Sequence, residues 1–258
     1  MLYDTAKTNV IGVETKAGSK FYADKVVLCA GAWTNSLIDT KGQLVPKGHC
    51  IAHIQLTPEE HKRYAGIPVV DDSKWNIYYF EPFDNGVMKF AALSSGYTIS
   101  GAPRTQADHP EDGIPKEAVE HLRRGMRATV PSLADHEFFD LRVCWCVDTP
   151  DLHFLIAPHP DLKGLYIATG GMSSWILLFN SGSSHGFKFL PRLGHYIALM
   201  LEGTLPDEFA EHWKWRPAQQ RTDHVRNEWT LFGKDFEEAE GWEGSANHGP
   251  MAHTWGNP

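Results

Sequence analysis

The chain has 258 residues, of which 42% are hydrophobic and 22% charged, and 24 basic against 32 acidic side chains give it a net charge of −8. This composition is that of a globular protein with one large domain or two interleaved ones. The negative charge argues against a nucleic-acid partner, because neutralising phosphates requires a basic face.

Targeting and cysteine signals are weak. No apolar run approaches the roughly 20 residues that span a bilayer, and the residues after Met1 form neither the basic nor the apolar region of a secretory signal. The four cysteines contain no C-x-x-C pair, so neither a disulfide scaffold nor a structural zinc site is expected. The last residues, Trp255–Pro258, are not a Ser-Lys-Leu peroxisomal address. We therefore expect a cytoplasmic protein with no membrane partner.

The first predicted elements are a hairpin and a buried strand. Residues 10–15 and 20–24 flank a turn that contains glycine, which is typical of a β-hairpin. The β-branched apolar run over 25–30 is typical of a strand buried on both faces, as in a parallel sheet. It ends at small residues that allow close approach of the backbone, where Thr34 or Asn35 can cap a short helix.

From Gln43 to about Leu141 the pattern indicates an antiparallel sheet with helices, suited to a substrate domain. A helix begins at Thr57–Pro58, and residues 115–130 carry apolar side chains at helical spacing. The strands are expected over 50–56, 77–81 and 86–92.

The remaining part returns to short apolar strands, followed by a helix over 193–201. After Trp213–Arg216 the sequence is a polar, weakly patterned tail, and 243–258 are expected to be disordered. The strands are predicted over 140–145, 153–157 and 164–169, the last ending at Gly170 and Gly171.

Three segments together resemble one family. Val26–Trp33 resembles the strand-to-loop element by which glutathione-reductase-type flavoproteins bring backbone against FAD. Cys144–Asp151 is similar to the flavin-attachment segment of the monomeric sarcosine oxidases, fructosyl-amino-acid oxidases and saccharopine oxidases. His185–Phe189 resembles their downstream segment that contacts the flavin and the substrate carboxylate. The order is that of the family, and the similarity runs from about Val10 to Trp215.

This resemblance implies an α/β fold that combines a partial glutathione-reductase-type FAD-binding fold with an antiparallel-sheet substrate domain. The implied domains are a partial FAD-binding domain over 1–42, the substrate domain over 43–140, a returning FAD-binding segment over 141–205 and a C-terminal tail over 206–258.

The resemblance also implies a covalent attachment of FAD. A thiolate at Cys144 would bond to the flavin, whereas the alternative is a buried and unreactive cysteine. Cys146 points to the same face of a strand and can compete for attachment, but the family position matches Cys144. The other implied cofactor-binding residues are Ala30, Gly31, Ala32, Trp33, Gly170, Gly171, Gly186, Phe187 and Lys188.

Two lysines receive functional roles from the resemblance. Lys89 matches the family lysine that helps O₂ accept electrons, because a fixed cation stabilises the superoxide that forms first. The alternative is an edge-strand lysine that prevents aggregation. Lys188 would bind the substrate carboxylate, with Gly186 admitting the backbone to the ring. The alternative for Lys188 is a solvated side chain, although a cation in a first helical turn opposes the helix dipole.

Other chemistries are disfavoured. His49 and His53 lie on a predicted strand, where their spacing does not make them converge on a metal ion. No Gly-x-Ser-x-Gly motif accompanies the 14 histidines. The segment Trp213–Arg216 is interpreted as packing rather than as a platform for nucleic-acid bases.

The chain departs from the family in two ways. It has no Gly-x-Gly-x-x-Gly and begins roughly 150 residues into the family pattern, so the cradle for the ADP part of FAD is not expected and uncovered strands favour self-association. It also carries the segment Met172–Gly182 where family members continue almost directly. Either this apolar run packs in a place that the family lacks or it reflects a gene-model error, and we favour the error.

The sequence thus predicts an FAD-dependent oxidoreductase that oxidises the C–N bond of a secondary amine in an amino-acid derivative. O₂ would be the acceptor and hydrogen peroxide a product, and the partner is a small-molecule amine. The alternative is a truncated, catalytically inactive remnant of such an oxidase that does not bind FAD.

Overall fold

The computed structural model describes residues 1–92, 96–99, 101–104, 108–109, 112–151, 153–170, 189–216, 236–239 and 242–243. The described residues form two compact units. Unit 1 takes its residues from 1–46, 146–170 and 189–216, and unit 2 from 47–145 and 236–243. Sheets and helices are mixed in the chain, and the largest sheet is antiparallel where its register is defined, which confirms the predicted fold class.

Unit 1 begins with the predicted hairpin. The strands β2 (Val10–Glu14) and β3 (Lys20–Tyr22) pair antiparallel, and β1 (Leu2–Tyr3) pairs with the other edge of β2. Gly18 occupies the turn with a φ of 85°, a conformation that favours glycine, and its N–H donates to the carbonyl of Thr15 at 2.9 Å.

A second sheet in unit 1 has the order β11-β12-β4. Strand β4 (Val26–Leu28) pairs parallel with β12 (Leu165–Gly170), which confirms the parallel pairing expected from its apolar run. Strand β11 (Phe154–Pro158) pairs antiparallel with β12. Leu28 is buried, whereas Val26 and Val27 are half-buried.

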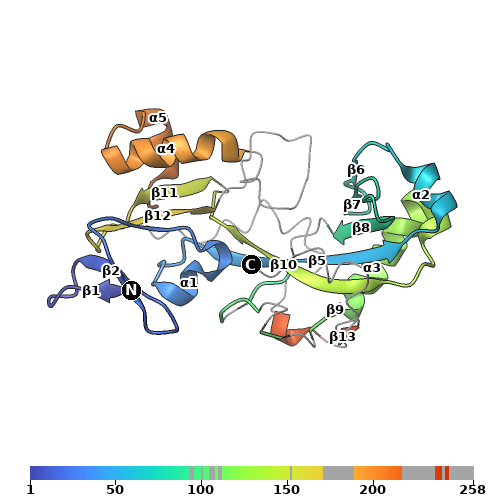
Figure 1. Cartoon of the computed structure of the whole chain (residues 1–258), viewed down its shortest axis with the longest axis horizontal. Helices are drawn as coiled ribbons and strands as arrows, with labels where there is room; N and C mark the ends of the chain where they lie inside the picture. The colour runs from blue at the N-terminus through green and yellow to red at the C-terminus, as the bar shows by residue number, and fades with distance from the viewer. Residues whose placement is uncertain are drawn as a thin grey trace. The chain divides into compact units, whose positions relative to one another are not determined.

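The helices α4 (Leu190–Glu202) and α5 (Asp207–Trp213) lie over β11 and β12 (Figure 1). Their apolar side chains pack with Phe154 and Ile156 of β11 in one cluster that includes Trp213. Helix α4 ends at Gly203, whose φ of 73° suits the residue that follows a helix. Helix α5 ends before the polar tail begins, and the sequence predicts no element over its residues.

The predicted cap after β4 is wrong. A 3₁₀ turn, η1 (Gly31–Trp33), leads directly into the short helix α1 (Thr34–Leu37). Trp33 takes the capping position, where its side chain does not cap the helix. Thr34 is already helical and its Oγ1 donates to the carbonyl of Gly31 at 2.7 Å, while Asn35 donates to the carbonyl of Leu44.

Unit 2 is built on a five-stranded sheet of order β10-β5-β8-β7-β6. The pairs β5–β8, β8–β7 and β7–β6 are antiparallel, as predicted for this part of the chain. The strands are β5 (Val45–Gln55), β6 (Val70–Asp72), β7 (Ile77–Tyr79), β8 (Val87–Ala92) and β10 (Phe139–Asp148).

Two predicted helices of unit 2 are present. Helix α2 (Pro58–Tyr64) begins at Thr57, which exchanges hydrogen bonds with Glu60 in a capping box. Helix α3 (Lys116–Thr129) packs on one face of the sheet through its apolar side. The remaining elements are η2 (Pro131–Leu133), η6 (Phe236–Glu238) and the paired strands β9 (Ile114–Pro115) and β13 (Trp242–Glu243).

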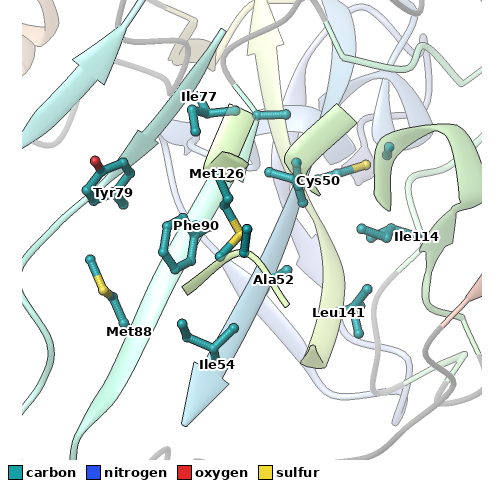
Figure 2. Close-up of a cluster of buried hydrophobic side chains, with 14 of the residues drawn as sticks. Cys50, Ala52, Ile54, Ile77, Tyr79, Met88, Phe90, Ile114, Met126 and Leu141 are labelled. Atoms are coloured by element: carbon teal, nitrogen blue, oxygen red, sulfur yellow. The ribbon is translucent and has the colours of Figure 1, made fainter. Parts of the chain in front are cut away.

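The core of unit 2 lies between the sheet and α3. Figure 2 shows its central side chains, in which Ile54 and Phe90 of the sheet lie near Met126 of α3. Gly125 permits the close approach of α3, because a Cβ there would lie 2.7 Å from side-chain atoms of Ile77. This packing leaves the opposite face of the sheet available for other residues.

In the part of the chain that the structure describes, no helix has both the length and the apolar character needed to cross a membrane. The expected disorder over 243–258 concerns residues that lie outside the described ones, except for Glu243, which belongs to β13.

Candidate active site

The face of the unit 2 sheet that is turned away from α3 carries a group of polar residues. Ile54, Phe90 and Leu141 belong to the core under α3. Successive side chains of a strand point to opposite faces, so the neighbours of these three residues, one on each of β5, β8 and β10, point to the other face. Those neighbours are His53, Lys89 and Asp140.

His53 and Asp140 are in direct contact. The Nδ1 atom of His53 lies 3.2 Å from the backbone oxygen of Asp140 and 3.3 Å from its Oδ2 atom. Both side chains are buried, and the histidine ring packs on Phe139 with 5.9 Å between ring centroids. Arg142, two residues along β10, places its Nη2 atom 3.0 Å from the same Oδ2 atom.

The charges around His53 oppose one another. Burial lowers its pKa from the ordinary 6.5, the carboxylate and backbone oxygen of Asp140 raise it, and the positive charges of Arg142 and Lys89 lower it again. The net result is a lowered pKa, so the imidazole is neutral at neutral pH.

Lys89 lies directly opposite His53 in the antiparallel pair of β5 and β8. Its side chain is half-buried, and its Nζ atom lies 5.9 Å from the centroid of the Tyr78 ring on the next strand. An ammonium group at this distance from a tyrosine ring is favourably placed for a cation–π interaction. The structure thus places Lys89 beside a neutral histidine and an aromatic ring.

Cys144 and Cys146 differ in exposure, although both lie on β10: Cys144 is exposed and Cys146 is buried. Trp145 between them turns toward the α3 side, where its Nε1–H donates to the carbonyl of Arg104 at 2.8 Å and its ring packs on Phe236. By alternation, Cys144 points to the same face of the sheet as Lys89.

The candidates in unit 1 surround two strand ends. After β4, Ala30 and Trp33 are half-buried and Ala32 is buried. Gly31 has a φ of 52°, and a Cβ there would meet no atom within 4 Å. At the end of β12, Gly170 has a φ of 77°, and a Cβ there would lie 2.9 Å from the Cγ2 atom of Thr149. Both glycines hold left-handed backbone that other residues rarely adopt.

Four candidates, Gly171, Gly186, Phe187 and Lys188, lie outside the described residues, as does the segment Met172–Gly182.

A buried arginine in unit 1 did not emerge from the sequence as a separate feature. Arg216 donates from Nε to Oδ2 of Asp151 at 2.6 Å and from Nη2 to the carbonyl of Phe154 at 3.2 Å. The side chain of Gln43 accepts a hydrogen bond from the backbone N–H of Arg216 at 2.9 Å and donates one to the backbone carbonyl of Arg216 at 2.8 Å. Arg216 thereby fixes the turn between β10 and β11, which follows the strand that carries Cys144.

The polar cluster on the unit 2 sheet was also missed. His53 and His49 were considered only as metal ligands, and among the described residues no group of three or more His, Cys, Asp or Glu side chains is arranged to hold a metal ion. The signal that could have found the cluster is the charged pair Asp140 and Arg142, two residues apart on a strand whose other residues, except Asp148 at its end, are apolar.

Comparison with known proteins adds the family. The pattern of the family described as "FAD dependent oxidoreductase" matches residues 3–200. L-saccharopine oxidase of Schizosaccharomyces pombe is 34% identical over 221 residues, which are 81% of this chain and 48% of that protein. Monomeric sarcosine oxidase of Bacillus sp. (strain NS-129) is 28% identical over 195 residues, or 74% of this chain and 46% of that enzyme.

Among solved structures, fructosyl peptide oxidase from E. terrenum is 36% identical, with a TM-score of 0.81 over 95% of this chain and 56% of that one. The chain therefore spans about half the length of the relatives that it matches. The family pattern covers most of the residues of this chain. The segments Val26–Trp33 and Cys144–Asp151, which resemble the family, lie within the matched residues. The chain belongs to the FAD-dependent oxidoreductase family and is related to the saccharopine, sarcosine and fructosyl peptide oxidases.

Proposed function

We propose that this chain serves an FAD-dependent oxidase that oxidises the C–N bond of a secondary amine in an amino-acid derivative. When bound, FAD supplies a two-electron acceptor for that bond and a route for the electrons to O₂, which yields hydrogen peroxide. The observation that carries the proposal is the shared sheet face of Lys89 and Cys144, two residues that the family resemblance links to oxygen and to the flavin.

The described residues fit this cofactor. Covalent attachment requires an accessible thiol, and Cys144 is exposed whereas Cys146 is buried. Cys144 is therefore the proposed attachment residue. At the end of β4, the open space around Gly31 leaves its backbone accessible, which supports a role for Ala30–Trp33 in binding the cofactor.

Lys89 is the proposed oxygen-activating residue. Its ammonium group lies on a strand in the middle of a sheet, between β5 and β7, rather than on an edge strand. The alternative role in preventing edge-to-edge aggregation therefore loses its basis. A cation held in a partly buried place stabilises the negative charge that O₂ acquires when it takes its first electron.

The substrate assignment rests on the family alone. Lys188 is proposed to bind the carboxylate of the amino-acid derivative and Gly186 with Phe187 to line the cofactor, as do Gly170 and Gly171. The names of the relatives indicate the class: an amino group substituted by a carbon chain, with a carboxylate nearby.

A chimera tests the proposal. This chain would be joined to the part of the S. pombe L-saccharopine oxidase that it does not match, and the purified protein would be precipitated with acid. We expect flavin to remain on the protein, Cys144→Ala to release it and Cys146→Ala to retain it. Peroxide should form with saccharopine or with related secondary amines.

Two results would count against the proposal. Flavin that is lost in acid from the unsubstituted chimera would contradict the role of Cys144. A chimera with acid-stable flavin that produces no peroxide from any secondary amine would contradict the activity.

A further inference from the structure

The sheet face that carries Lys89 holds three further polar residues that the proposed function does not use. They are His53 on β5 and Asp140 with Arg142 on β10. Since β5 lies between β10 and β8 in the sheet, His53 lies between Asp140 and Lys89. A buried acid–histidine pair therefore lies beside this lysine.

The position of the His53 proton follows from its contacts. Nδ1 faces two oxygens of Asp140, at 3.2 Å and 3.3 Å, and both are acceptors. The proton of the neutral ring therefore lies on Nδ1, which leaves a lone pair on Nε2. The ring is 1% exposed and packs on Phe139, so it has little room to turn.

Asp140 is held for this contact in an uncommon conformation. Its φ is 45°, in the left-handed region that costs a residue other than glycine some energy. Its Oδ2 atom already forms an ion pair with the Nη2 atom of Arg142, at 3.0 Å. The negative charge is thus shared between Arg142 and the Nδ1–H of His53.

Lys89 lies next to the pair of His53 and Asp140 and interacts with it electrostatically. It is the cross-strand neighbour of His53, and side chains opposite each other in an antiparallel pair are within reach. The two residues are also electrostatically coupled, because the charge of Lys89 disfavours protonation of His53. A neutral ring with a free lone pair can face an ammonium group without repulsion, whereas a protonated ring would push it away.

We propose that His53 is a positioning residue for Lys89: burial keeps its imidazole neutral, Asp140 fixes the proton on Nδ1, and the ring holds the ammonium group of Lys89 on this face of the sheet. The inference rests on the proposed role of Lys89 toward O₂. It assigns no contact with substrate or flavin to His53 or Asp140, and its test does not require flavin.

The first experiment is NMR of the 258-residue chain with ¹⁵N-labelled histidine. We expect the His53 ring to be neutral at neutral pH with its proton on Nδ1. Lys89→Met should move its titration to higher pH, since a neighbouring cation is removed. Asp140→Asn should move it to lower pH, and asparagine tolerates the positive φ. Lys20→Met, on the exposed strand β3, should leave it unchanged.

The second experiment measures how fast a limiting acylating reagent labels Lys89, with Lys20 as the internal reference. His53→Phe keeps a ring against Phe139 but removes both nitrogens, and should raise labelling of Lys89 several-fold. His53→Gln, whose amide can reach the place of Nε2, should restore slow labelling.

A proton on Nε2, or a His53 titration that Lys89→Met leaves unchanged, would overturn the inference. So would equal labelling of Lys89 in the unsubstituted chain and in His53→Phe. If His53→Phe does not fold, the NMR result on the unsubstituted chain and on Lys89→Met decides. A failure of the proposed function would be seen differently. In that case Lys89→Met would leave the rate of the reaction with O₂ unchanged, although it would still shift the titration of His53.

Discussion

Gln43 and Arg216 exchange two hydrogen bonds across 173 residues of sequence. The Oε1 atom of Gln43 accepts from the backbone N–H of Arg216 at 2.9 Å, and its Nε2–H donates to the backbone carbonyl at 2.8 Å. Both residues are buried. One glutamine side chain therefore satisfies the backbone of a distant segment as a strand would.

We expect Gln43→Leu to destabilise unit 1 strongly. The substitution leaves the N–H and the C=O of Arg216 buried without partners, at a cost of about 1–3 kcal/mol for each. Urea unfolding measures the loss. The control is Gln55→Leu, because the exposed Gln55 side chain should contribute less than about 0.5 kcal/mol. Equal losses in the two variants would mean that the bonds to Arg216 contribute little.

The pair of Asp151 and Arg216 predicts a dependence of stability on acid. Partial burial raises the pKa of Asp151, but the hydrogen bond and charge of Arg216 and the backbone N–H of His153 outweigh it, so the pKa lies below the ordinary 3.8. A depressed folded-state pKa stabilises the fold above the unfolded value, and this contribution is lost as the pH falls through the folded value.

The unfolding free energy should therefore decrease as the pH falls below about 3.8, and it should decrease less in Asp151→Asn. The difference between the two urea titrations isolates Asp151 from the other carboxylates. Because the Asp151 side chain is 44% exposed, solvent screening reduces the effect. Identical pH profiles for the two proteins would show that the ion pair does not couple to folding.

Gly48 allows β5 to approach β10. A Cβ at this position would lie 2.5 Å from Cγ1 of Val143 and 3.0 Å from the ring of Trp145. Gly48→Ala should therefore destabilise unit 2 by about 1–3 kcal/mol through overpacking, and Val143→Ala in the same chain should restore part of the loss. Gly101→Ala is the control, since a Cβ there meets nothing. A neutral Gly48→Ala would show that the strands separate easily.

The exposure of the cysteines predicts their order of alkylation. Cys144 is exposed, whereas Cys146 and Cys50 are buried, and burial with the nearby charge of Glu117 raises the pKa of Cys50 far above the ordinary 9.0. The reactive species is the thiolate in contact with solvent. Mass spectrometry after brief treatment with iodoacetamide should find Cys144 modified before either buried thiol. If Cys146 reacts as fast as Cys144, exposure does not favour Cys144 for flavin attachment.

Lys89→Met should separate the two half-reactions of a flavin-loaded protein. Removal of one group that stabilises a developing anion typically slows a step by about 10²-fold. We expect the reaction with O₂ to slow by this order while reduction by the amine changes little, as stopped-flow absorbance would show. Lys20→Met is the matched control. Equal slowing of both steps would indicate that Lys89 is structural.

Much of the fold was predictable because local patterns are strong. The apolar run of β4, the Thr57–Glu60 capping signal and the helical spacing of α3 each specify one element. Helix α5 was missed because its seven residues lie in polar sequence and are held by Trp213 against β11. The cap at Thr34 was wrong because the chain enters α1 from a 3₁₀ turn that already places Thr34 in the helix.

In the candidate site, only residues that belong to a family-like sequence segment could be predicted. Cys144 and Lys89 were found from their motifs, and their roles stay predictions. His53 and Asp140 were not paired, because 87 residues separate them and their contact depends on strand order and on the positive φ of Asp140. Neither the strand order nor this φ value can be predicted from the spacing of residues in the sequence.

The long separation between Gln43 and Arg216 also sets an order of events during synthesis on the ribosome. Strand β4 pairs with β12, and Gln43 binds Arg216, only after more than a hundred further residues have been translated. The described residues of 47–145 belong to the other unit, which in turn needs residues 236–243 for its core, so both units stay incomplete until late segments of the chain have been made. At about 5–20 residues per second, the apolar residues of β4 stay without their β12 partner for seconds, which is time enough for a chaperone that binds exposed strands to reach them.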